Sequence, residues 1–132
     1  RALQRLGAEH AVVVYGRDGM DEVSLGASTL VGELKNGEVT EYEIHPEDFG
    51  LTMSSHRALR VDTPEDSRDM LKAVLNNQPG AALNIVAINA GVALYAANVA
   101  PTMQDGLKLA QQVLANGQAL EKLNQFISYT NR

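Results

Sequence analysis

Short apolar runs separated by turn residues occupy the first third of the chain, and this pattern predicts β-strands. The first run is "AVVVY", residues 11–15, which is rich in β-branched residues and lies between Gly7 and Gly16. A short, continuously apolar run of this kind is typical of a buried strand in a parallel sheet. We therefore predict a buried parallel strand over residues 11–15, followed by the loop "GRDGMDE".

A β-hairpin is predicted within residues 28–44. Asn36-Gly37 lies there between two runs with strand propensity, and this dipeptide is the strongest short-range hairpin signal. A two-residue turn at this point fixes which residues of the two strands face each other. The predicted register pairs Lys35 with Glu38, Glu33 with Thr40, and Val31 with Tyr42.

The second half of the chain has helical periodicity and predicts four helices. Thr63 before Pro64 marks the start of the first, and "NNQPG" ends it. The second, about 80–97, is apolar nearly all round and is expected in the core. The third begins at the N-cap Thr102, and the fourth covers about 118–130. The side chains expected to be buried are Met70, Leu71, Val74 and Leu75 in the first helix, Leu107, Ala110, Val113 and Leu114 in the third, and Leu120, Leu123 and Ile127 in the fourth.

These elements predict an α/β fold in which residues 1–132 form part of one domain with no internal boundary. Four helices cannot all bury their apolar stripes against three short strands, so we expect preceding residues to complete the sheet. "RALQRLG" resembles the last two turns of a helix closed by Gly7, and it lacks an initiating Met. We therefore expect the chain to be a fragment whose N-terminal part lies outside the sequence.

Composition excludes several classes of function. The net charge of −5, with scattered basic residues, argues against nucleic-acid binding. The absence of cysteine excludes disulfides and thiolate chemistry, and it fits a cytoplasmic protein. Residues 81–100 are the most apolar stretch, but Asn84, Asn89 and Asn98 interrupt them, which predicts a buried helix and no membrane association.

The adjacent acids Asp21 and Glu22 are the candidate metal-binding residues. They lie in a glycine-flanked loop after the first strand, where two neighbouring carboxylates can converge on one cation. Mg²⁺ is usually held by one or two carboxylates together with waters and substrate phosphates. Ligands of open α/β sheets bind at the carboxyl ends of parallel strands, which would suit this loop. The alternative, a solvated turn with two surface acids, is the commoner explanation of such a pair in isolation.

The other polar residues near this loop carry weaker signals. Asp18 could add a third acid and Arg17 could meet a phosphate, although a surface role is the simpler explanation for both. The three histidines, His10, His45 and His56, show no metal-ligand spacing. Asn84 and Asn89, on the apolar helix, are expected to satisfy hydrogen bonds in the core.

The stretch "LGAEHAVVVYGRDGMDEVSLGASTLVGELKNGEVTEYEIHPEDFGL" resembles, nearly from end to end, the later part of the anthranilate phosphoribosyltransferase family. The resemblance resumes at "AINAGVALYAANVA" and at "DGLKLAQQVLANGQALEKL". These motifs follow in the family's order and spacing and cover most of the chain. The resemblance implies the C-terminal part of a phosphoribosyltransferase α/β catalytic domain, from a protein of tryptophan biosynthesis.

The resemblance also implies a function and a metal site. Family members transfer phosphoribose from phosphoribosyl pyrophosphate to anthranilate, and the acidic pair of this loop helps to hold Mg²⁺ on the pyrophosphate. The matching positions are Asp21 and Glu22. The phosphate-binding glycine loop, most of the anthranilate pocket and the helices of the usual homodimer lie upstream in the family. The fragment alone is therefore expected to be inactive.

One segment departs from the family pattern. Residues 59–70 are "LRVDTPEDSRDM", where the family commonly has a Gly-Gly-Asp/Glu stretch followed by Ala-Glu-Asn. No role in the site is assigned to these residues. Two other hypotheses stay open from the sequence. A related phosphoribosyltransferase or a pyrimidine nucleoside phosphorylase would use another acceptor, and a non-catalytic helical interaction fragment would leave the acids as a solvated turn.

Overall fold

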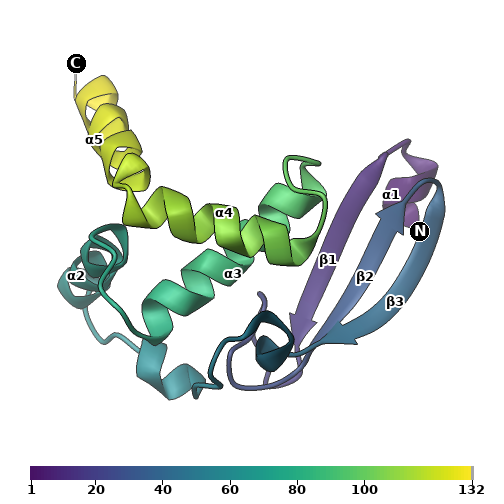
Figure 1. Cartoon of the computed structure of the whole chain (residues 1–132), viewed down its shortest axis with the longest axis horizontal. Coiled ribbons are helices and arrows are strands. Elements are labelled where there is room, and N and C mark those ends of the chain that lie inside the picture. Colours follow the sequence, from purple (N-terminus) through teal and green to yellow (C-terminus); the bar gives the residue numbers. More distant parts are fainter. Residues whose placement is uncertain (132) are drawn as a thin grey trace.

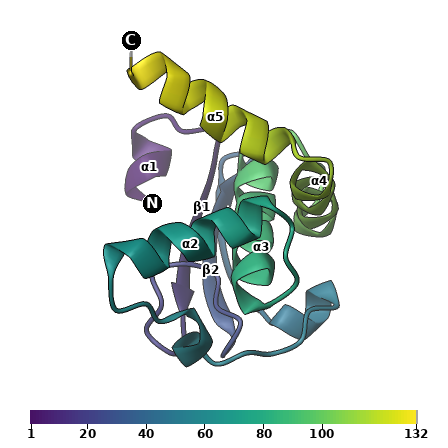
Figure 2. The same ribbon diagram turned by 90° about the vertical axis from the view of Figure 1, so that its left-hand side faces the viewer.

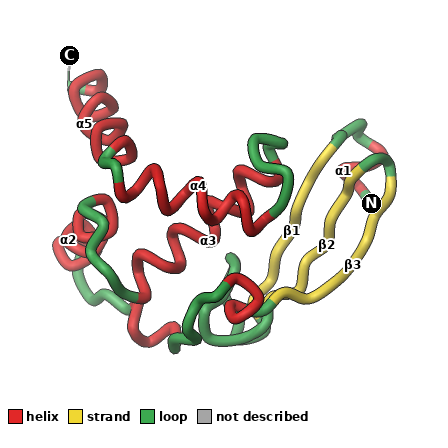
Figure 3. Tube along the Cα trace, viewed as in Figure 1, coloured by secondary structure: helices red, strands yellow, loops and turns green. Residues whose placement is uncertain are grey.

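A computed structural model describes residues 1–131 as a three-stranded sheet joined to a group of helices (Figures 1 and 3). The sheet lies at one end of the molecule, α3 and α4 lie in the middle, and α2 and α5 lie at the other end. The mixed α/β class predicted from the sequence is confirmed. The elements are α1 (Ala2–Arg5), β1 (His10–Gly16), β2 (Thr29–Lys35), β3 (Glu38–Ile44), the 3-10 helices Pro46–Phe49 and His56–Leu59, α2 (Pro64–Leu75), α3 (Ala81–Ala96), α4 (Met103–Ala115) and α5 (Gln118–Thr130).

The β2–β3 hairpin has the predicted register. Lys35 pairs with Glu38, and the ladder continues through the predicted pairs to Thr29 and Ile44. Asn36 and Gly37 have φ angles of 52° and 77°. A two-residue turn with both central residues at positive φ matches the twist of the strands, which explains why Asn-Gly occurs here.

The environment predicted for β1 was wrong. Within the described residues its strand partner is β2, and the pairing is antiparallel. Val12 and Val14 face the core, whereas Val13 and Tyr15 are 61% and 51% exposed. A run of apolar residues indicates strand propensity, but it carries no information about the direction of the neighbouring strand.

The four predicted helices are confirmed, together with two of their caps. Thr63 Oγ1 accepts a hydrogen bond from the backbone N–H of Asp66, and Thr102 Oγ1 accepts one from Asp105, both at 3.0 Å. α3 is the apolar helix of residues 81–100 and ends at Ala96. No helix in the described part of the chain is long and apolar enough to cross a membrane. At the N-terminus Gly7 adopts a φ of 84°, but the helix before it has one turn instead of the two predicted.

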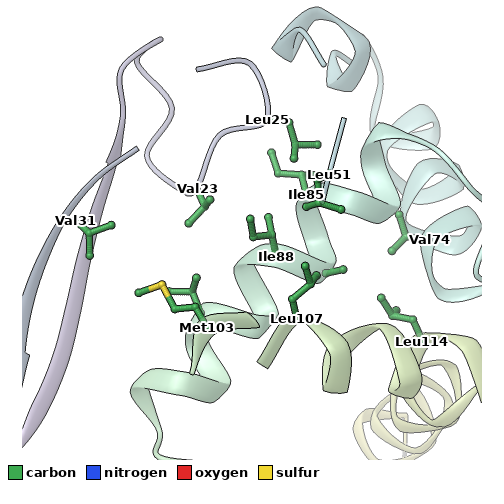
Figure 4. Close-up of a cluster of buried hydrophobic side chains, with 12 residues drawn as sticks. Val23, Leu25, Val31, Leu51, Val74, Ile85, Ile88, Met103, Leu107 and Leu114 are labelled. Atoms are coloured by element: carbon green, nitrogen blue, oxygen red, sulfur yellow. The ribbon is translucent and has the colours of Figure 1, made fainter. Parts of the chain in front are cut away.

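The core is the contact between α3, α4 and the loop that joins β1 to β2 (Figure 4). Figure 4 shows Ile88 of α3 among side chains from these segments. The loop therefore contributes side chains to the core as well as polar groups to the surface. The buried cluster comprises Val23, Leu25, Val31, Leu51, Val74, Ile85, Ala87, Ile88, Val92, Met103, Leu107 and Leu114.

α3 and α4 approach each other at two glycines. A Cβ atom at Gly91 would lie 2.5 Å from the backbone N of Leu107, and a Cβ at Gly106 would strike the carbonyl group of Gly91. Because both neighbours are backbone atoms, the two helices can be this close only if each presents a glycine at the crossing.

The burial predicted for α5 was partly wrong. Leu120 and Leu123 are half-buried, but Ile127 is 46% exposed and no residue of this helix is buried. Figures 1 and 2 show α5 meeting the other helices near its start while its C-terminal end projects away from them. Leu71 of α2, which was also expected to be buried, is 50% exposed. Periodicity identifies an apolar stripe but not the surface that covers it.

Candidate metal-binding loop

The loop between β1 and β2 begins with a tight turn. Gly16 donates its N–H to the carbonyl of Met20, and Gly19 donates to the carbonyl of Gly16, both at 2.9 Å. The chain then runs through bends without regular secondary structure until Thr29 begins β2. Strand alternation therefore does not apply to Asp21 and Glu22, as the sequence led us to expect.

The side chain of Asp18 lies inside this loop and contacts other residues of it. Its Oδ2 accepts a hydrogen bond from Ser24 Oγ at 2.7 Å and lies 3.9 Å from His56 Nδ1. A Cβ atom at Gly16 or at Gly26 would lie 2.8 or 3.0 Å from the carboxylate oxygens of Asp18. The surface role preferred from the sequence was wrong for this residue, because the loop closes around its carboxylate.

Asn89 of α3 holds the same loop from outside. Its Oδ1 accepts a hydrogen bond from the backbone N–H of Val23 at 2.8 Å, and its Nδ2 donates to the Val23 carbonyl at 3.0 Å. Nδ2 also donates to the carbonyl of Ile85 at 3.0 Å. The prediction that this side chain satisfies hydrogen bonds in the interior is confirmed for Asn89, but it was wrong for Asn84, whose carboxamide has no hydrogen-bond partner within residues 1–131. The partner of Asn89, Val23, lies 66 residues earlier in the chain, and the sequence alone did not predict this pairing.

Asp21 is exposed and Glu22 is half-buried. Burial and then the neighbouring charge of Asp21 raise the pKa of Glu22, so the two carboxylates lie within electrostatic reach of each other. Glu22 lines one edge of a cleft of about 540 Å³ whose other walls are mainly apolar residues of α2 and α3.

The donor set fits a cation that brings most of its own ligands. No three His, Asp or Glu side chains in residues 1–131 are placed to hold one metal ion. An all-protein cage is therefore not formed by the described residues. Two adjacent carboxylates suit Mg²⁺, which keeps several waters and binds through one or two carboxylates plus substrate phosphates. The assignment of Asp21 and Glu22 as ligands stays a prediction.

The remaining charged candidates have local partners. Arg17 binds Glu43 of β3 through Nη2 at 2.5 Å and Nε at 3.0 Å. Its surface role is therefore the better of the two interpretations. Hydrogen bonds from Arg17 and Ser28 lower the pKa of Glu43.

A buried polar network at the opposite end of β1 was missed by the sequence analysis. The carboxylate of Glu33 accepts hydrogen bonds from Tyr95 at 2.5 Å, Tyr42 at 2.8 Å and His10 at 2.9 Å. Burial opposes ionisation of Glu33, but these three donors outweigh it and lower its pKa. Lys35 Nζ adds a 3.0 Å hydrogen bond to the Tyr95 hydroxyl. The network joins all three strands to the C-terminal end of α3. It lies toward the end of the sheet opposite the acidic loop.

Comparison with known proteins defines the class of this chain. The family described as "Glycosyl transferase family, a/b domain" matches residues 1–120, and the chain belongs to this family. Within it, the chain is similar to the anthranilate phosphoribosyltransferase of Paracidovorax citrulli, with 71% identity over 98% of this chain and 38% of the relative. It spans about 38% of the length of the curated relatives that it matches.

Solved structures give the same relationship for the fold. The crystal structure of anthranilate phosphoribosyltransferase from Thermus thermophilus superposes with a TM-score of 0.89 at 34% identity, over 99% of this chain and 38% of that chain. The Saccharomyces cerevisiae enzyme in complex with PRPP and Mg has a TM-score of 0.77 at 23% identity, over 89% of this chain and 34% of that chain. The fold predicted from the family resemblance is confirmed by both.

Proposed function

We propose that this chain is the metal-holding segment of an anthranilate phosphoribosyltransferase, which moves phosphoribose from phosphoribosyl pyrophosphate to anthranilate. The observation that supports this most strongly is the 71% identity to the P. citrulli enzyme across 98% of the chain. The acidic pair lies within that matched region and has the donor chemistry that Mg²⁺ prefers.

In the proposed reaction the anthranilate amine attacks the anomeric carbon of the ribose as pyrophosphate leaves. A bound Mg²⁺ would stabilise the negative charge that develops on the leaving group. Asp21 and Glu22 would act as ligands and not as a general acid or base. Because burial, and then the charge of Asp21, disfavour the ionised form of Glu22, a nearby cation would offset a cost that this loop already carries.

Mg²⁺ is the ion of choice in this proposal for two reasons. The carboxylate pair has no further protein ligand among the described residues. The yeast protein of the same fold was solved with PRPP and Mg. A homodimer formed by helices outside this segment, and a cytoplasmic location, stay predictions.

A full-length chimera tests the proposal. The chain replaces the matching segment of the P. citrulli relative, and Mg²⁺-dependent consumption of anthranilate with phosphoribosyl pyrophosphate is measured. We expect the chimera to be active and the double variant Asp21→Asn, Glu22→Gln to lose Mg²⁺-dependent turnover while it stays folded. The control removes two exposed acids of β3 by Glu38→Gln and Glu41→Gln, and it should keep full activity. Unchanged turnover and Mg²⁺ dependence in the Asp21, Glu22 variant would disprove the assignment of these ligands.

A further inference from the structure

The carboxamide of Asn89 pairs with the backbone of Val23 as a strand neighbour would. It accepts from the Val23 N–H and donates to the Val23 carbonyl, while its third hydrogen bond, to Ile85, fixes the side chain on α3. The carboxamide of an Asn or Gln offers a donor and an acceptor side by side, which an ionised carboxylate does not.

The loop needs this pairing because it has no strand partner at Val23. Val23 is 1% exposed, so its N–H and carbonyl lie where unpaired backbone groups are costly. Without Asn89 the loop would have to shift to bring these groups to water. Glu22 is the residue next to Val23, and Asp21 is the next one before it. A shift at Val23 would therefore move the acidic pair.

We propose that Asn89 is a positioning residue for the acidic pair: it fixes the loop at Val23 so that Asp21 and Glu22 present one geometry to Mg²⁺. This inference rests on the function proposed above. Asn89 does not contact the ion or the substrate in this account, and its effect passes through the backbone of Val23. Groups that orient metal ligands typically change metal affinity 10- to 100-fold when they are altered.

The variant Asn89→Asp, made in the full-length chimera, tests the donor half of the pairing. An ionised Asp keeps the shape and can accept from the Val23 N–H, but it cannot donate to the carbonyl of Val23 or Ile85. Asn89→Ser is the second variant and removes both halves. The matched control is Asn84→Ala on the same helix, because the Asn84 carboxamide has no hydrogen-bond partner within residues 1–131.

Two readouts separate positioning from general stability. The first is the Mg²⁺ affinity of the complex with phosphoribosyl pyrophosphate, measured by calorimetry, together with the Mg²⁺ concentration for half-maximal turnover. We expect the Asn89 variants to weaken both about 10- to 100-fold. Turnover at saturating Mg²⁺ should recover, and Asn84→Ala should change neither quantity. The second readout is hydrogen exchange of the Val23 amide, which should be slow in the unmutated chimera and fast in both Asn89 variants.

Each outcome decides between the hypotheses. If the Asp21, Glu22 variant loses Mg²⁺ affinity but Asn89→Asp and Asn89→Ser keep it, the role of Asn89 is overturned and the proposed function stands. If the Asp21, Glu22 variant keeps its Mg²⁺ affinity, the assignment of these two ligands and this inference fail together. Should neither Asn89 variant fold, fast exchange of the Val23 amide in the unmutated chimera would still overturn the inference, and slow exchange would support it.

Discussion

Gly91 on α3 is a position where one added methyl group should disturb the fold strongly. A Cβ there would lie 2.5 Å from Leu107 N, 2.7 Å from Leu107 Cα and 2.8 Å from the carbonyl carbon of Gly106. Ordinary contacts of this kind are about 3.5–4.0 Å. All three neighbours are backbone atoms of α4, so no rotamer change can relieve the overlap. The helices must instead separate by about 1 Å.

The free-energy change of Gly91→Ala combines two opposing effects. Alanine favours a helix interior over glycine by about 1 kcal/mol. Overpacking a close contact costs about 1–3 kcal/mol and occasionally more, and a gap of 0.5–1 Å forfeits about a quarter to a half of each remaining dispersion contact. The α3–α4 contact includes Ile88, Val92 and Leu107 from the core. Because no rotamer change relieves the overlap, the overpacking cost should lie near the top of its range, and subtracting the helix-propensity gain leaves a net destabilisation of about 2 kcal/mol.

Native-state hydrogen exchange of the full-length chimera measures this effect at the helix itself. A loss of about 2 kcal/mol corresponds to about 30-fold faster exchange of the α3 amides. The control is Gly32→Ala on β2, where an added Cβ meets no atom within 4 Å. That variant should leave α3 exchange unchanged. If Gly91→Ala exchanged no faster than the control, the close helix crossing described here would be wrong.

Two further predictions concern the sheet. Tyr95→Phe removes one of three donors to buried Glu33 and should destabilise the protein by about 1–3 kcal/mol. The pKa of Glu33 is lowered on folding, so its stabilisation is present above the ordinary Glu pKa and lost as the pH falls through the lowered value. Tyr95→Phe should therefore move the onset of acid unfolding, followed by circular dichroism, to higher pH; an unchanged onset would contradict the network. Gly37→Ala places a side chain at a φ of 77° and should lower the free energy of unfolding by about 1 kcal/mol. The measurement is hydrogen exchange of the hairpin amides, which should become faster. Exchange equal to that of Gly32→Ala would contradict the positive φ described for this turn.

Features that depend on neighbours in the sequence were predictable. The Asn36-Gly37 turn fixed the hairpin register because two residues at positive φ leave one way for the strands to pair. Thr63 and Thr102 marked helix starts because an N-cap bonds to a backbone group three residues later. In both cases the interacting groups lie within a few residues of each other.

Features that join distant segments were not predictable from the residues. His10, Glu33 and Tyr95 have no informative spacing, and they meet because the strand register and the end of α3 bring them together. The direction of the neighbour of β1 and the partial exposure of α5 have the same origin, since an apolar pattern does not specify its partner. Asp21 and Glu22 were found as a pair by sequence, but their position depends on Asp18 within the loop and on Asn89 outside it.

The position of the bound ion tests the central claim most directly. Crystals of the full-length chimera with phosphoribosyl pyrophosphate and Mn²⁺, an ion that shares the oxygen ligands of Mg²⁺, give the metal position from anomalous scattering. We expect a metal peak about 2.1 Å from carboxylate oxygens of Asp21 and Glu22 and bridged to the pyrophosphate. A metal bound to the pyrophosphate while both carboxylates remain uncoordinated would contradict it.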